Sequence, residues 1–300
     1  DLLTNMVVEF PELQGVMGGH YLRLEGADEE LWTAARDHYR PAGFEGGIPA
    51  SETGRLLGVA DRLDTLAGLF AVGEIPTGSK DPLGLRRAAQ AVVKIVAEAG
   101  WGLDLEAAVT KAVEGLEGLV DGPVGETVAT LGDFMADRVR RYLTDFVGVG
   151  GDAADAVMAA GWSDLPELAA RVRALDAVRT SEQMRALSLA FKRVKNITED
   201  ASSSSVDPGC FEQDEERELH DAAALFAGKL AECVEARRFD DAFAAMGELA
   251  EVLDRFFVEV LVMCDDPTVR DNRVALLTKL RNDFLHLADL SRLQVDGGKQ

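Results

Sequence analysis

Apolar residues recur at helical spacing along almost the whole chain. Alanine, leucine, glutamate and arginine dominate, aromatic residues make up only 6%, and no run of β-branched residues alternates with polar ones. The pattern therefore predicts an all-α fold. In the first half, Asp81 and Pro82 are typical of a helix start, apolar positions continue to Val96, and Gly100 is a stop signal. Another amphipathic helix is predicted over residues 132–146.

The second half contains two breaks in the helical pattern. Residues 148–152 (GVGGD) predict a flexible break, and residues 201–209 (ASSSSVDPG) predict a polar loop. The other segments are predicted to be helical, at 153–160, from Asp164 onward, 181–197, 215–236, 240–263 and 269–290, with 215–236 and 240–263 as an antiparallel pair. We therefore divide the chain into a helical domain, a helical linker region and a helical bundle, at residues 1–150, 151–180 and 181–300.

Composition limits the classes of function. The 300 residues are 47% hydrophobic, enough for a sizeable core, but no apolar run is long enough to cross a bilayer. The net charge of −22 argues against broad nucleic-acid binding, so any RNA contact needs a local basic patch. Cys210, Cys233 and Cys264 lie far apart, which favours a reducing compartment over a disulfide framework or a zinc site. We read the sequence, which begins at Asp1 without a secretion signal, as a piece of a longer chain.

The predicted helix over residues 181–197 has one apolar face and one polar face. Its apolar face is formed by Met184, Leu187, Phe191 and Val194, and the adjoining polar face mainly by Arg185, Ser188, Lys192, Lys195 and Asn196. One interpretation is an RNA-contacting face, because lysine and arginine meet phosphates and asparagine can read a base edge. The pattern alone favours the other interpretation, an ordinary solvated face.

The last predicted helix carries Arg270, Arg273, Lys279 and Arg281. Arg273 falls on the same arc as the apolar Leu277, Leu280 and Phe284, so we expect it to be buried and paired. The candidate partners are Asp254, Asp266 and Asp289. Arg270 is expected to be more exposed than Arg273.

No catalytic residue or metal ligand is assigned from spacing. The segment PTGSKDP at 76–82 lacks the spacing of a phosphate-binding P-loop, and it is interpreted as a capped turn before a helix rather than as an anion site. The four histidines have no ligand spacing to one another, and no Ser-His-Asp or Cys-His arrangement can be proposed.

Four phrases in this chain are not demanded by helix formation. They are EFPELQGVMG (9–18), ADRLDTLAGLFAVGEIPTGSKDPLGLRRAA (60–89), AFKRVKNI (190–197) and RDNRVALLTKLRNDFLHLADLSRLQ (270–294). Together they resemble, in order, the C-terminal portion of the β subunit of the bacterial two-subunit glycyl-tRNA synthetase. The resemblance extends from Asp1 to about Gln294. The chain has KDPLGL where KDPFAL is usual, so Gly84 is expected to weaken a helix turn there.

The resemblance implies a fold and a function. The fold is an HD-like helical domain followed by a helical-bundle anticodon-binding domain of the arginyl-tRNA synthetase type. The function is to bind and orient tRNA-Gly for ATP-dependent glycylation, which is carried out with ATP and Mg in the α subunit of an α2β2 assembly. The piece alone is then expected to be inactive and to hold no cofactor. The expected compartment is the cytoplasm, with a plastid carrying a bacterial-type enzyme as the alternative.

The resemblance also implies which residues bind. The residues expected to bind tRNA are Arg185, Lys192, Arg193, Lys195, Asn196, Arg270 and Arg281. Weaker candidates, for contact with tRNA or with the α subunit, are Lys80, Arg86 and Arg87.

Two other functions stay open. One is a metal-dependent phosphohydrolase of the HD type, because this part of the family resembles an HD phosphohydrolase domain. This chain has no His-Asp dipeptide, so Asp61 and Asp64 are expected to be structural. The second alternative is a scaffold that binds the α subunit without RNA contact. The acidic net charge supports it, and it would be favoured if the basic residues of 181–197 are scattered or held in ion pairs.

Overall fold

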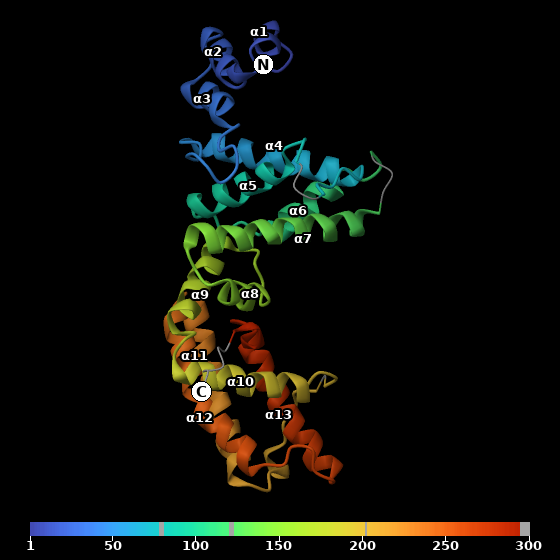
Figure 1. Ribbon diagram of the computed structural model, residues 1–300, viewed down its shortest axis with the longest axis vertical. Coiled ribbons are helices and arrows are strands. Elements are labelled where there is room, and N and C mark those ends of the chain that lie inside the picture. The colour runs from blue at the N-terminus through green and yellow to red at the C-terminus, as the bar shows by residue number, and fades with distance from the viewer. Residues whose placement is uncertain (78–80, 120–122, 202, 295–300) are drawn as a thin grey trace, which may run out of the picture. The chain divides into compact units, whose positions relative to one another are not determined.

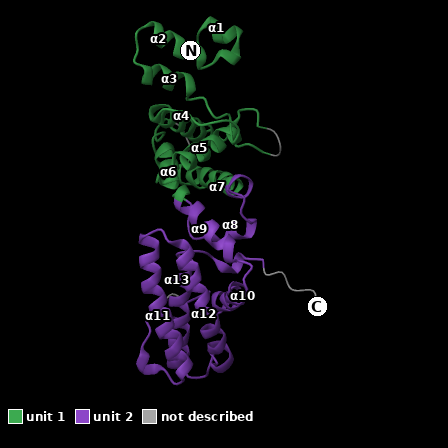
Figure 2. Cartoon of the chain, turned by 90° about the vertical axis from the view of Figure 1, so that its left-hand side faces the viewer, with its two compact units in different colours: residues 1–142, 163–166 green, residues 143–162, 167–300 purple. Residues whose placement is uncertain are grey.

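A computed structural model of the chain describes residues 1–77, 81–119, 123–201 and 203–294 (Figure 1). Regular structure within these residues is helical and contains no β-strand, which confirms the all-α prediction. None of the helices described is both long enough and apolar enough to cross a membrane. The chain forms two compact units (Figure 2): unit 1 contains residues 1–142 and 163–166, and unit 2 contains residues 143–162 and 167–300. The division into three domains at 150 and 180 stays a prediction.

Unit 1 is built mainly from four helices that pack side by side. Its helices are α1 (Asn5–Glu9), a 3-10 turn η1 (Pro11–Leu13), α2 (Val16–Leu24), α3 (Glu29–Asp37), α4 (Glu52–Ala71), α5 (Leu85–Ala99), α6 (Leu105–Glu114) and α7 (Val124–Tyr142). Helices α4, α5, α6 and α7 contact one another and enclose Leu66, Val92, Leu105 and Met135, which are fully buried. Helices α2 and α3 pack together, and α3 also contacts α4.

The start of α5 differs from the prediction. The helix begins at Leu85 and not at Asp81–Pro82, because Gly84 adopts a left-handed conformation with φ of +70°. That conformation cannot continue a right-handed helix, so Gly84 is the last residue before α5 and not a weak point within it. Asp81 still serves the helix start, since its carboxylate accepts a hydrogen bond from the backbone N–H of Arg86 at 3.0 Å. The predicted stop at Gly100 is confirmed, with φ of +67°.

Unit 2 is a helical bundle. Its elements are a π-helical turn η2 (Leu143–Val147), α8 (Gly151–Met158), α9 (Leu165–Val178, whose first two residues lie in unit 1), α10 (Glu182–Ile197), a 3-10 turn η3 (Pro208–Cys210), α11 (Asp214–Glu235), α12 (Phe239–Glu259), α13 (Pro267–Leu285) and a 3-10 turn η4 (Leu290–Arg292). The predicted helix at 132–146 is therefore α7 followed by η2. The predicted helix at 269–290 ends at Leu285, because the chain turns so that the N–H of Asp289 donates to the carbonyl of Ala156.

Aromatic side chains join three helices of this bundle. Phe191 of α10 stacks on Phe284 of α13 at 5.5 Å between ring centroids, and Phe226 of α11 meets Phe284 edge-on at 5.4 Å. Phe191 and Phe284 are fully buried. Since α11 also packs along α12, the four long helices share one core.

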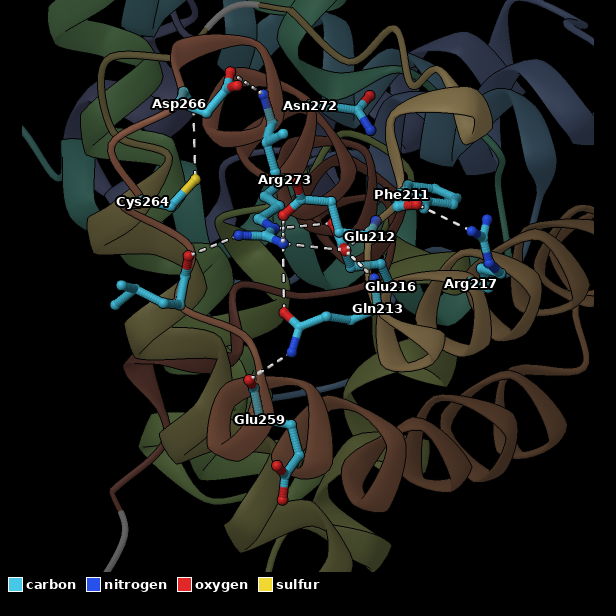
Figure 3. A network of polar contacts seen from close by, with 12 residues as sticks. Phe211, Glu212, Gln213, Glu216, Arg217, Glu259, Cys264, Asp266, Asn272 and Arg273 are labelled. Atoms are coloured by element: carbon cyan, nitrogen blue, oxygen red, sulfur yellow. Dashed lines mark hydrogen bonds and ion pairs between the residues drawn. The ribbon is translucent and has the colours of Figure 1, made fainter.

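Arg273 of α13 is buried, as predicted, but its partners are not the predicted ones (Figure 3). Its Nε donates to Glu216 of α11 at 2.9 Å, and its second terminal nitrogen reaches Glu212 at 3.3 Å. Asp266 instead caps the first turn of α13, and Asp289 pairs with Lys195. The prediction that Arg270 is more exposed is confirmed, with 36% of its side chain accessible against 4% for Arg273.

Candidate nucleic-acid interface

The local sequence of α10 positions its two faces. Ser181 caps the helix by accepting a hydrogen bond from the N–H of Met184 at 3.2 Å. The four predicted apolar residues, Met184, Leu187, Phe191 and Val194, are all buried. Ser188 was predicted on the polar face, but it is fully buried and donates to the carbonyl of Leu290 at 2.9 Å. The polar face of α10 that is available to a ligand is therefore narrower than predicted, because it does not include Ser188.

A pocket of about 400 Å³ opens beside this face. Four of the predicted tRNA-binding residues line it: Lys192, Lys195 and Asn196 from α10, and Arg281 from α13. The pocket is completed by Glu199, Leu285 and Ser291. Residues nearly ninety positions apart in the sequence therefore form one basic concavity in unit 2, where α10, α13 and η4 meet.

The three cations of this pocket are all tied to the protein. Lys195 Nζ lies 2.7 Å from Asp289 Oδ2 and 3.2 Å from Ser291 Oγ, while Lys192 Nζ donates to the carbonyl of Leu293 at 3.3 Å. Arg281 donates to the backbone carbonyl of Thr198 and to its hydroxyl, the latter at 3.0 Å. Each ammonium carries three N–H donors, so both lysines keep donors that a ligand can use.

Two other polar side chains in the pocket, Asn196 near the end of α10 and Glu199 in the turn after it, differ from these cations. The side chains of Asn196 and Glu199 are exposed and make no hydrogen bond or ion pair with any other described residue. Sequence reasoning missed Glu199, which lies in the turn just after α10. Leu285 and Ser291 were also missed, and only the tertiary packing brings them to the pocket.

The remaining predicted residues of unit 2 lie outside the pocket. Arg185 is exposed two turns before Lys192 on the same side of α10. Arg193 is exposed and covers the ring of Phe257 at 4.3 Å, on the side of α10 that faces α12. Arg270 pairs with Asp271 at 3.2 Å, three helical turns from Arg281. The structure therefore brings together four of the seven residues.

Asp289 has a pKa below the usual range for an aspartate. Burial by itself would raise its pKa, but hydrogen bonds from Lys195 and from Ser291 stabilise the charged form and outweigh burial. The pKa of Asp283 shifts in the opposite direction. Burial raises it, and the charges of Lys279 and His286 offset this rise only in part. Asp289 is the anchor that holds Lys195 at the rim of the pocket.

We expect Asp289→Asn to lower the free energy of unfolding of unit 2 by about 1–2 kcal/mol near neutral pH, because the charge-assisted hydrogen bond between the buried Asp289 carboxylate and the half-exposed Lys195 ammonium is lost. A group whose folded pKa is depressed stabilises the fold above its unfolded pKa, and this contribution disappears as the pH falls through the folded pKa. The difference between the two proteins should therefore shrink below about pH 4 in urea unfolding curves. Asp271→Asn, at an exposed pair, is the matched control and should change little. A difference that is constant across this pH range would contradict the assignment.

The weaker candidates lie in unit 1. Lys80 is outside the described residues. Arg87 is exposed and lines a separate pocket of about 210 Å³ together with Asp61 and Arg62. Arg86 is half-buried at the start of α5, close enough to Arg138 of α7 to help lower the pKa of that arginine, which burial lowers most. Sequence reasoning did not single out Arg138, whose guanidinium lies 3.6 Å from the ring centroid of Phe134.

The two aspartates of the ADRLDTL motif lie on the surface of unit 1, and their structural role stays a prediction. Asp61 and Asp64 are exposed on α4, and the buried charged residue of the motif is Arg62 between them. Among the residues that the structure describes, no group of three or more histidine, cysteine, aspartate or glutamate side chains could hold a metal ion.

Comparison with known families assigns both parts of the chain. A family described as "Glycyl-tRNA synthetase beta subunit" matches residues 1–159, which is more than half of the chain. The chain belongs to the glycyl-tRNA synthetase beta subunit family. A second family, described as "DALR anticodon binding domain", matches residues 184–290. This second match begins within α10, ends in η4 and includes every pocket residue except Ser291.

Curated relatives support the same family over the whole chain. The beta subunit of glycine–tRNA ligase from Geotalea daltonii is 38% identical over 293 residues, covering 98% of this chain and 42% of the relative. The corresponding subunit from Anaeromyxobacter sp. strain K is 39% identical over 304 residues, covering 100% of this chain and 43% of the relative. The chain thus spans less than half the length of these family members.

Proposed function

We propose that this chain is the C-terminal portion of a glycyl-tRNA synthetase β subunit and that its unit 2 binds tRNA-Gly. The observation that carries the proposal is the pocket that gathers Lys192, Lys195, Asn196 and Arg281 within the region that matches an anticodon-binding domain. Cations at such a rim can meet phosphates, and the amide of Asn196 can meet a base edge. A local basic concavity reconciles RNA binding with the net charge of −22.

In this proposal the chain orients its RNA and does not carry out the chemistry. The α subunit supplies the site for ATP, Mg and glycine, and the β subunit holds tRNA-Gly so that its acceptor end reaches the activated amino acid. Fixing the two reactants in the right geometry contributes to the rate without any catalytic group in this chain. The assembly is proposed to be an α2β2 heterotetramer in the cytoplasm, and this chain alone is proposed to be inactive in glycylation.

Binding of the chain to tRNA-Gly across a salt series tests the proposal. We expect tighter binding to tRNA-Gly than to a non-cognate tRNA, with an affinity that falls as salt rises because counterions are released. Lys192→Ala should weaken binding several-fold and reduce the slope of log affinity against log salt by about 1. Lys229→Ala is the matched control, because Lys229 is an exposed lysine of α11 that does not line the pocket.

Two outcomes would contradict the proposal. No binding of tRNA-Gly at low salt would mean that the chain does not engage RNA. Equal effects of Lys192→Ala and Lys229→Ala would mean that binding depends on overall charge and not on the pocket.

A second candidate function is a scaffold that binds the α subunit without RNA contact. The observation that favours it is that Lys195 is held by Asp289, and Arg281 by Thr198, so part of the pocket's positive charge serves the fold. In this case the chain should bind the α subunit with unchanged affinity after Lys192→Ala. The same protein should show no salt-dependent binding to tRNA-Gly.

A further inference from the structure

We infer that the pocket of α10, α13 and η4 holds one unstacked base of the bound tRNA and that Glu199 selects a base with an exocyclic amino group. The inference rests on the proposed function, because it names what the proposed RNA site reads. It assigns a specificity role to a residue that the basic character of the site would not suggest.

Glu199 lies in the pocket beside three cationic side chains. A carboxylate that lines a pocket with Lys192, Lys195 and Arg281 would be expected to pair with one of them. It pairs with none, and each of the three cations contacts other protein groups instead. The acceptor oxygens of Glu199 therefore stay available at the pocket surface, unlike those of Asp289, whose side chain is only 5% exposed.

Asn196 and Leu285 line the same pocket as Glu199. Asn196 lies near the end of α10, and its amide is also without a partner among the described residues. Leu285 provides an apolar wall from α13. An amide and a carboxylate beside an apolar wall fit the edge and the face of a base, and the volume of about 400 Å³ is in the range of small-ligand pockets.

The carboxylate of Glu199 favours a ligand group that donates hydrogen bonds. Ionised Glu199 can only accept hydrogen bonds, and it repels phosphate. It therefore matches the part of a nucleotide that donates, which is the amino group of cytosine, adenine or guanine. Uracil has no amino group and presents a carbonyl at the place where cytosine has one, so it should be rejected. The lysines at the rim would face the phosphates that flank this base.

Removal of single exocyclic amino groups from the RNA tests the inference. In tRNA-Gly transcripts, each unpaired cytidine, guanosine or adenosine is replaced in turn by uridine, inosine or purine riboside, which lack the amino group. We expect one position at which binding to the unmodified chain falls about tenfold. With Glu199→Gln, whose amide can donate as well as accept, the loss at that position should shrink to about twofold or less.

A control variant that loses a carboxylate outside the pocket separates base recognition from charge repulsion. Asp200→Asn removes a neighbouring exposed carboxylate that does not line the pocket, and it should leave the tenfold loss unchanged. If Glu199 only repelled phosphate, Glu199→Gln would tighten binding to every transcript by the same factor, as Asp200→Asn would, and the inference would be overturned.

The failure of this inference differs from the failure of the proposed function. Binding of tRNA-Gly that depends on Lys192 but shows no amino-group effect at any position would overturn base selection by Glu199 and keep the RNA-binding function. Absence of salt-dependent tRNA-Gly binding would overturn both.

Discussion

Replacing Arg273 by alanine should lower the free energy of unfolding of unit 2 by about 3–5 kcal/mol. Its partner Glu216 is completely buried, so removing the guanidinium leaves a carboxylate without its counter-charge inside the bundle (Figure 3). Glu216 also accepts hydrogen bonds from the backbone N–H groups of Glu212 and Gln213 at the start of α11, at 2.9 and 2.8 Å. One side chain therefore both caps α11 and joins it to α13.

The pKa of Glu216 reflects this competition. Burial alone would raise its pKa, but the hydrogen bonds from Arg273 and from the two backbone N–H groups outweigh burial, and its pKa lies below the usual range for a glutamate. The carboxylate is therefore charged in the folded protein at neutral pH, which is why the loss of Arg273 is costly.

Urea unfolding followed by hydrogen exchange in α11 and α13 measures the effect, because the two units need not unfold together. Arg270→Ala, which removes a half-buried arginine from the same helix, is the matched control and should change stability by less than about 0.5 kcal/mol. The double substitution Arg273→Met with Glu216→Leu should recover part of the loss, because no buried charge is then left unpaired although the N–H groups of Glu212 and Gln213 lose their acceptor. A loss for Arg273→Ala no larger than for Arg270→Ala would refute the role of the ion pair.

Helical periodicity predicted much of this fold, and its misses have physical reasons. The spacing of Leu277, Leu280 and Phe284 placed Arg273 on a buried face, because side chains that repeat at helical intervals share one side. The same spacing could not identify Glu216, which lies 57 residues earlier and comes into contact only when α11 packs on α13. At Gly84, the sequence signals of Asp81 and Pro82 were overridden by a left-handed backbone conformation.

The candidate site was predicted in part for the same reason. Lys192, Lys195 and Asn196 share a helical face and so could be grouped from sequence, whereas Arg281 was grouped with them by family resemblance. The pocket that unites them depends on η4 turning back onto α10, a contact that local sequence does not encode. The pairing of Lys195 with Asp289, 94 residues later, was missed for that reason.

Substitution of Arg62 in α4 should have the second large effect on the free energy of unfolding. Its guanidinium donates to four backbone carbonyls, those of His38 at 2.7 Å, Tyr39 at 2.7 Å, Pro41 at 3.0 Å and Gly58 at 2.8 Å. Burial lowers its pKa, and the nearby Asp61 offsets this only in part. Three of the four carbonyls belong to the segment that follows α3, so this side chain ties that segment to α4.

We expect Arg62→Met to lower the free energy of unfolding of unit 1 by about 3 kcal/mol, because it keeps an apolar stem and removes the guanidinium donors from the carbonyls of His38, Tyr39 and Pro41. Arg62→Lys should recover only part of this, since one ammonium cannot reproduce the planar fork that serves several acceptors. Arg55→Met is the matched control: Arg55 is less buried on the same helix and donates to the carbonyls of Pro49 and Ala50. It should cost about 1 kcal/mol or less.

Urea unfolding and hydrogen exchange of residues 38–40 measure the Arg62 effect, and the exchange of that segment should accelerate in Arg62→Met before unit 1 unfolds. Equal stability losses for Arg62→Met and Arg55→Met would contradict the proposed role of Arg62 in holding that segment. The expected result would also explain why an arginine stands between two aspartates in the ADRLDTL motif. With Asp61 and Asp64 exposed and Arg62 buried against backbone carbonyls, the motif stabilises the loop between α3 and α4 through Arg62.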